Sequence, residues 1–154
     1  MKKIEFASTE YGDLTGKTVD YNVLVNGNKP PLTSLKGAPK QVNNDFFCNS
    51  NNLQSLEYAP EYVDGHFNCR NNLLTSFKHA PKYIRRHFIA DTNMVDDPIG
   101  DIIKYRIKAE RYYVTIDDEV KQFSFEVIKD KYDEYEKMKS VTSKGFRTLL
   151  GLDK

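Results

Sequence analysis

The chain has 154 residues, the length of one domain, and its 23 basic and 22 acidic residues leave a formal net charge of +1. This balance argues against a general electrostatic role on nucleic acid, and no run of about 18 uncharged apolar residues is present that would span a bilayer. The residues after Met1 lack the apolar region of a secretory signal, so we expect a cytoplasmic protein without a membrane partner.

Residues 1–31 are expected to form an N-terminal cap rich in strands. Residues 3–18 are predicted to form a hairpin. Residues 23–28 combine a short β-branched and apolar run with a turn, which predicts a degenerate first repeat that the hairpin would pack against. The cap would therefore cover the first full repeat.

Residues 32–95 repeat themselves three times with a period of 21 residues. Seven positions share this register, namely Leu32/Leu53/Leu74, Leu35/Leu56/Phe77, Pro39/Pro60/Pro81, Val42/Val63/Ile84, Phe46/Phe67/Phe88, Cys48/Cys69/Ala90 and Asn51/Asn72/Asn93. A fixed period in this range is typical of a solenoid, in which each unit buries its apolar face against its neighbours. Phe67 and Cys69 are two residues apart and share the inner face of a short strand, which leaves Asn68 and Arg70 on the outer face.

The repeating unit reads F-x-C-x-x-N-x-L-x-x-L-x-x-A-P-x-x-V. It resembles the leucine-rich repeat family, whose core reads L-x-L-x-x-N-x-L. Within that family it is similar to small proteins encoded by tailed bacteriophages, and its period is similar to that of Leu-Pro repeats in bacterial effector proteins. The resemblance covers residues 32–95. It implies a concave parallel sheet and a ladder of Asn51, Asn72 and Asn93 that hydrogen-bonds to backbone in the turns.

The same period can be extended upstream into the degenerate unit. It pairs Tyr21 with Val42 and Val25 with Phe46. On this alignment Pro30 takes the asparagine position, so the ladder is expected to begin at Asn51.

Residues 96–154 are expected to form a mainly helical C-terminal cap on the last repeat. Asp97 is a suitable N-cap and Pro98 a suitable first residue for a helix whose apolar stripe lies within residues 99–107. The further predicted elements are an extended segment at residues 112–116, a second apolar helical stripe at residues 127–138 and a short helix at residues 144–150. The expected fold is thus an α+β repeat protein, a short solenoid with two caps.

The outward side chains of the repeat strands are the predicted partner-binding site. They are Asp45, Phe47, Asn49, His66, Asn68, Arg70, His87, Ile89 and Asp91. Phe47 and Ile89 would present apolar surface outward, and arginine among such side chains is typical of interface hot spots. Cover of Phe47 by a cap is the alternative. Ladder spacing would make His66 and His87 neighbours, although two solvated histidines without a role would show the same pattern.

Neither a cofactor nor a metal ion is expected. Cys48 and Cys69 occupy an inward position, where cysteine packs as a small apolar residue, and no inward histidine or carboxylate accompanies them. Residues 12–18 resemble a phosphate-binding loop, but only three residues separate the two glycines where that motif has four, and a strand-like segment follows. We expect no catalytic residues.

The expected function is non-enzymatic protein binding. The phage resemblance implies a partner in the host cytoplasm, with inhibition of a host defence protein as the sharpest form of this hypothesis. A self-associating structural or virion protein is the alternative, followed by a nucleic-acid binder and an enzyme. Some effectors join similar repeats to a ubiquitin-ligase domain with a catalytic cysteine, but residues 94–154 contain no cysteine.

Overall fold

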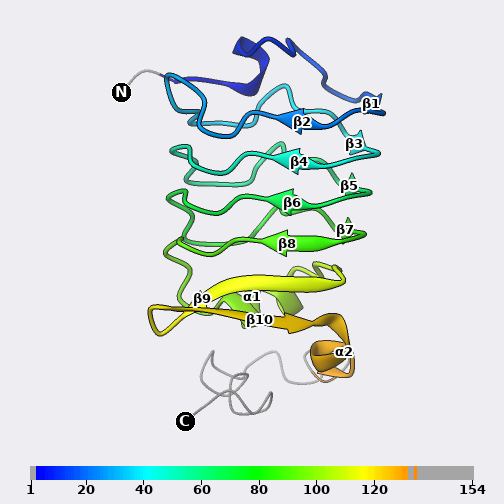
Figure 1. The fold of residues 1–154 in the computed structure, drawn as a ribbon, viewed down its shortest axis with the longest axis vertical. Coiled ribbons are helices and arrows are strands. Elements are labelled where there is room, and N and C mark those ends of the chain that lie inside the picture. The colour runs from blue at the N-terminus through cyan, green and yellow to red at the C-terminus, as the bar shows by residue number, and fades with distance from the viewer. Residues whose placement is uncertain (1–2, 132–133, 135–154) are drawn as a thin grey trace.

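A computed structural model describes residues 3–131 and 134 and shows a β-solenoid of stacked parallel turns (Figure 1). One sheet has the order β1 (Thr18–Val19), β3 (Gln41–Val42), β5 (Tyr62–Val63) and β7 (Tyr83–Ile84). The second sheet has the order β10 (Glu119–Ser124), β9 (Arg111–Ile116), β8 (His87–Ile89), β6 (Phe67–Asn68), β4 (Phe46–Phe47) and β2 (Val23–Leu24). The helical elements are η1 (Phe6–Ser8), α1 (Pro98–Lys104) and α2 (Phe125–Ile128). The predicted solenoid and its repeat period are confirmed.

The inner positions of the repeat stack into a continuous core. The rings of Phe46 and Phe67 are 5.7 Å apart and those of Phe67 and Phe88 are 6.1 Å apart, and all three side chains are fully buried. Each such side chain contributes on the order of 1.5–3 kcal/mol on burial. Because neighbouring turns contribute equivalent residues, one sequence column becomes one row of contacts through the whole stack.

The asparagine column ties each turn to the previous one. The Nδ2 group of Asn72 donates to the carbonyl oxygens of Cys48 and Cys69, both at 3.1 Å. Its Oδ1 accepts a hydrogen bond from the backbone N–H of Leu53 at 2.9 Å. Asn51 and Asn93 repeat this pattern one turn to either side. The amide ladder that the resemblance implies is therefore present.

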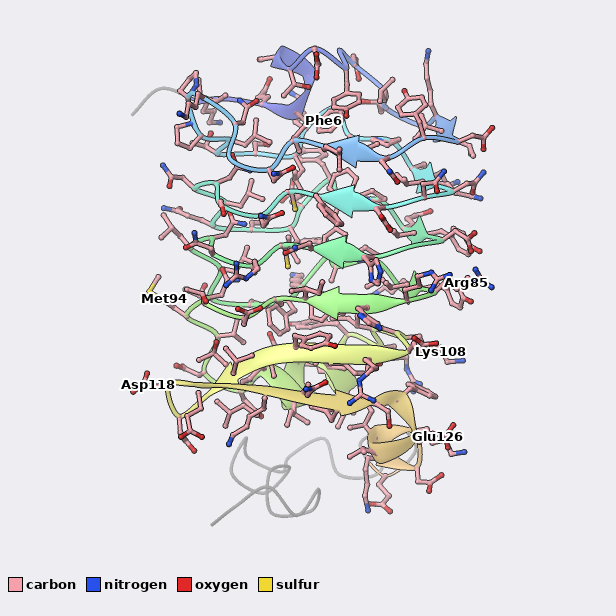
Figure 2. The ribbon with its side chains drawn as sticks, viewed as in Figure 1. Phe6, Arg85, Met94, Lys108, Asp118 and Glu126 are labelled. Atoms are coloured by element: carbon pink, nitrogen blue, oxygen red, sulfur yellow. The ribbon has the colours of Figure 1, made fainter. Side chains whose placement is uncertain are left out.

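The N-terminal cap differs from the prediction. Residues 3–17 contain η1 and turns, and their strand pairing is a single parallel bridge between Glu5 and Ser34, while Thr18 begins β1 and pairs parallel with Gln41, so the predicted hairpin is wrong. Phe6 is fully buried above the column of phenylalanines, with its ring 6.1 Å from that of Phe46 (Figure 2). The Tyr11 ring stacks on that of Phe6 at 5.8 Å, so aromatic rings rather than a hairpin cover this end of the column.

The first turn also has a different register from the one predicted. Val19 pairs with Val42, and Val23 pairs with Phe46, so both offsets are two residues longer than those between the later repeats. The predicted pairings of Tyr21 with Val42 and of Val25 with Phe46 are therefore wrong.

The two additional residues of the first turn lie between its last strand and the next repeat. Asn28 precedes Asn51 by the same longer offset, and three residues separate it from Leu32, whereas one residue separates Asn51 from Leu53. The insertion is therefore accommodated at residues 29–31, outside both sheets. Val25 then fills the cysteine position and is buried.

The C-terminal cap contains both helix and sheet. The predicted start of α1 is confirmed, since the Asp97 carboxylate accepts the Gly100 backbone N–H at 3.2 Å and Pro98 begins the helix. The predicted extended segment is β9, which continues the sheet parallel to β8 and places the Tyr112 ring 6.3 Å from that of Phe88. The chain then reverses near Asp118 into β10, which pairs antiparallel with β9 (Figure 2).

The expectation of a mainly helical cap is thus wrong for the part of the cap that the structure describes. Two strands of six residues form the hairpin β9–β10, and α1 and α2 have seven and four residues. The chain continues the sheet because β8 would otherwise expose its hydrogen-bonding edge. Of the second predicted stripe, Ile128 lies in α2 and is buried. The rest of that stripe beyond residue 131 and the helix predicted at residues 144–150 fall outside the described residues, apart from residue 134.

Replacing Asn72 with alanine is expected to lower the free energy of unfolding by about 1–3 kcal/mol, because the carbonyls and the N–H that it satisfies would lose a buried partner. Chemical denaturation followed by circular dichroism measures this loss. Gln54→Ala, at an exposed position, is the matched control and should change stability little. Equal losses in the two variants would contradict a structural ladder.

Candidate functional site

The outward side chains of the second sheet form one continuous surface, which we call the sheet face. The strand registers arrange it in three rows, each read from β2 to β10. They are Asn22/Asp45/His66/His87/Arg111/Ser124, Leu24/Phe47/Asn68/Ile89/Tyr113/Gln122 and Asn26/Asn49/Arg70/Asp91/Thr115/Val120. All nine predicted site residues lie on this face. The first and last strands were missed because their offsets depart from the repeat period.

The middle row is mainly apolar. Leu24 is 48% exposed, and Phe47, Ile89 and Tyr113 are each partly buried by their neighbours in the row. Asn68 interrupts the row at β6. Phe47 lies beside Leu24 on the neighbouring strand and keeps part of its surface exposed, so the N-terminal cap does not enclose it. The row is thus an apolar surface on a backbone that the sheet hydrogen bonds hold in place.

The row nearest the asparagine ladder contains an ion pair between Arg70 and Asp91. The Arg70 Nε donates to the Asp91 Oδ2 at 3.1 Å, and the Asp91 side chain is 7% exposed while that of Arg70 is 47% exposed. The hydroxyl of Thr92 donates to the same carboxylate oxygen at 3.3 Å. Asp91 was predicted to contact a partner, but its burial makes it the support that orients Arg70. The guanidinium is thereby held in one direction toward solvent.

The two histidines on the sheet face contact one another. The rings of His66 and His87 are 4.6 Å apart in an edge-on arrangement, and His87 Nε2 lies 3.4 Å from a carboxylate oxygen of Glu110. The backbone N–H of His66 donates to the Asp45 carboxylate at 2.7 Å. Burial lowers the pKa of His66, the Asp45 charge raises it, and the nearby His87 lowers it again. The predicted proximity of the histidines is confirmed, and His66 favours its neutral form.

The cysteines face the core. Both side chains are fully buried, and burial raises the pKa of the Cys48 and Cys69 thiols. A buried thiol with a raised pKa holds little thiolate, the form that acts as nucleophile and metal ligand. Within residues 3–131 and 134, no group of three or more histidine, cysteine or acidic side chains is arranged to hold a metal ion.

The segment at residues 12–18 forms turns. Gly12 and Gly16 both have positive φ angles, of 68° and 76°, and β1 begins at Thr18. The N–H and the hydroxyl of Thr15 both donate to the Asp13 carboxylate, at 3.1 and 2.6 Å. A carboxylate therefore fills the inside of this turn, which is unfavourable for a phosphate group.

Comparison of the chain with family models, with curated proteins and with solved structures gave no match in any of the three searches. Among the described residues, the structure contains no helix with the length and apolar character needed to cross a bilayer.

The stability contributed by neutral His66 should depend on pH. Because burial lowers its folded pKa, the unfolded chain binds this proton more readily than the folded protein does. This contribution is complete above about pH 6.5 and decreases as the pH falls through 6.5 toward the lowered folded pKa. The melting temperature of wild type should therefore fall more than that of His66→Gln between pH 7.5 and 5.5. Parallel melting curves for the two proteins would refute this assignment.

Both thiols should resist labelling in the native protein. A disulfide reagent such as 5,5′-dithiobis(2-nitrobenzoic acid) should react with Cys48 and Cys69 only after unfolding, because the side chains are fully buried and their pKa values are raised. The absorbance of the released thiolate, with and without denaturant, measures this difference. Rapid reaction in native buffer would show that the core opens or that one thiol is accessible.

Proposed function

We propose that this protein is a non-enzymatic protein-binding module and that its partner binds the sheet face. The observation that carries the proposal is the partly exposed apolar row of Leu24, Phe47, Ile89 and Tyr113 on a hydrogen-bonded sheet. A central apolar strip bordered by polar side chains is the usual anatomy of a protein interface. The oriented Arg70 beside it is the kind of residue that contributes disproportionately to binding energy.

Rigidity supports this use of the face. The strands that present the row are paired along their length, and the side chains beneath them are fully buried. The backbone of the site is therefore already ordered before a partner binds. Binding would cost little conformational entropy in this protein, which favours affinity. The two buried thiols, whose pKa values burial raises, are poorly suited to act as nucleophiles, which fits a binding role.

The resemblance to leucine-rich repeats suggests which kind of protein the partner is. The F-x-C-x-x-N-x-L motif and the amide ladder of Asn51, Asn72 and Asn93 support a relation to that family. The similarity to phage proteins leads us to propose a host protein as the partner, with inhibition of a defence protein as its most specific form. This step rests on resemblance, whereas the choice of the sheet face rests on geometry.

Self-association is the second candidate function. The apolar row would be covered equally well by the row of a second copy, and Val120, on the same face in β10, is 58% exposed. Two copies related by a two-fold axis would each contribute the same strip. This arrangement would suit a structural or virion protein.

The proposal predicts that a partner is lost when the apolar row is made acidic. We compare wild type with the double variant Phe47→Asp/Ile89→Asp in an affinity pull-down from bacterial host lysate, read by mass spectrometry. Tyr83→Asp, at a 40% exposed position on the other sheet, is the matched control. A protein retained by wild type and control but absent with the folded double variant is the expected result. Identical captures by all three proteins would place the binding site elsewhere.

Sedimentation velocity over a range of concentrations distinguishes the two candidate functions. The protein-binding proposal expects a monomer at micromolar concentration. A dimer that dissociates in Phe47→Asp/Ile89→Asp would favour self-association through the sheet face. A dimer unaffected by these substitutions would exclude that face as its interface.

A further inference from the structure

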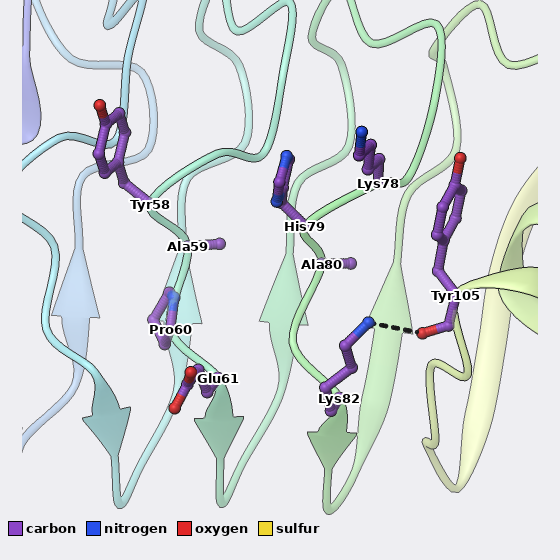
Figure 3. Close-up of a pocket in the computed structure, with 9 residues that line it drawn as sticks. All are labelled: Tyr58, Ala59, Pro60, Glu61, Lys78, His79, Ala80, Lys82 and Tyr105. Atoms are coloured by element: carbon purple, nitrogen blue, oxygen red, sulfur yellow. Dashed lines mark hydrogen bonds between the residues drawn. The ribbon is translucent and has the colours of Figure 1, made fainter.

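A second surface lies on the loops that lead into the first sheet, away from the sheet face. A groove of about 360 Å³ runs between the loops of two successive repeats and the residue after α1. Figure 3 shows the rings of Tyr58, His79 and Tyr105 pointing to the same side from successive loops, with Lys78 between the last two. The proposed protein-binding function makes no use of this groove.

Two of these rings belong to residues, Tyr58 and His79, whose backbone has an unfavourable conformation. The loops make a tight turn in which Ala59 N–H donates to the Leu56 carbonyl at 2.9 Å and Ala80 N–H donates to the Phe77 carbonyl at 3.0 Å. Tyr58 and His79 are the third residues of these turns, and both have a φ angle of +73°.

The equivalent residue one repeat earlier is Gly37, with a φ angle of +101°. Glycine is favoured at the third position of such a turn because a side chain strains the backbone there. The repeat therefore has a glycine-preferring position at which two successive units carry a ring.

Nothing described in the protein compensates for this strain. Tyr58 is 50% exposed and His79 is exposed. Neither side chain makes a hydrogen bond, ion pair or ring contact with any residue in the described part of the chain. On the neighbouring strands, by contrast, Tyr62 and Tyr83 stack on each other at 4.9 Å. Strain that is held without an internal partner indicates a role in contact with another molecule.

The charges around the groove identify the chemistry of that molecule. Cations outnumber carboxylates in the loops that carry the rings, with Lys78, Lys82, Lys104 and Arg106 against Glu57 and Glu61. The Lys82 ammonium donates to the Tyr105 carbonyl at 2.9 Å, which fixes it at one end of the groove. The near-zero net charge of the whole chain therefore does not describe this edge.

The Tyr105 ring is already covered by the Lys104 ammonium, 5.3 Å from its centroid, so the free rings are those of Tyr58 and His79. We propose that the groove binds nucleotides, with bases stacked on the rings of Tyr58 and His79 and phosphate groups beside Lys78 and Lys82. Unpaired rings in a row of cations are the arrangement by which proteins hold single-stranded nucleic acid without reading its sequence. The same chemistry fits a free mononucleotide. A strand would use successive rings, whereas a mononucleotide would use one.

The test measures binding of fluorescein-labelled oligo(dT) of eight nucleotides by anisotropy, and of thymidine monophosphate by calorimetry. The variants are Tyr58→Gly and His79→Gly, which place the favoured residue at the strained positions and should keep the fold. Their melting temperatures should lie within a few degrees of wild type. Tyr21→Gly, at a 46% exposed position on the N-terminal cap, is the matched ring control.

We expect oligo(dT) affinity to fall roughly tenfold or more in each glycine variant, to persist in Tyr21→Gly and to weaken as salt increases. Binding of the monophosphate alone would assign the groove to free nucleotides. Three results would each overturn the proposal: neither ligand binds wild type, the glycine variants bind as well as wild type, or a poly-glutamate peptide of equal charge competes as strongly as oligo(dT). The last result would mean that charge alone, without stacking, accounts for binding.

Discussion

The fold depends on one contact, the asparagine side-chain amide that joins each turn to its neighbour. The strands of the repeats have only two or three residues, so strand pairing alone satisfies few of the backbone N–H and C=O groups in each turn. The side-chain amides of Asn51, Asn72 and Asn93 donate to backbone carbonyls that follow the strands of the second sheet. Their oxygens accept the backbone N–H groups of Leu32, Leu53 and Leu74 in the preceding turn. Without these amides, backbone groups would be buried without partners, at a cost of about 1–3 kcal/mol for each group.

Because the ladder and the phenylalanine column stabilise the turns from inside, the outward positions are free to serve function. The two surfaces differ in how they are built. On the sheet face, side chains leave regular strands, and Arg70 gains its direction from the buried Asp91. On the loops, Tyr58 and His79 gain their direction from left-handed backbone positions. The first arrangement presents a broad strip suited to a protein, and the second presents separate rings suited to planar groups.

The sequence pattern predicted the middle of the molecule well because one residue type at one position has one environment there. The columns of Phe46 and Asn51 could be placed without a structure, as could the outward positions between them. The ends could not, because the insertion at residues 29–31 shifts the register and β9 follows β8 at an offset longer than the repeat period. The groove could not be predicted from the sequence because residue identity does not reveal a positive φ angle. The one sign of it was that Tyr58 occupies the position in the repeat that Gly37 occupies one unit earlier.

The two sheets end at different levels, which has a consequence for growth. Beyond β7 the first sheet continues as a single parallel bridge between Tyr83 and Lys108, while the second continues through β9 to the antiparallel β10. Within residues 3–131, another copy of the chain could continue the stack at this end only by extending both sheets at once, and the two sheets present their edges at different levels. Phe6 blocks the ring column at the opposite end. Within the described residues, the number of strands that present outward side chains to a ligand is therefore fixed by the sequence.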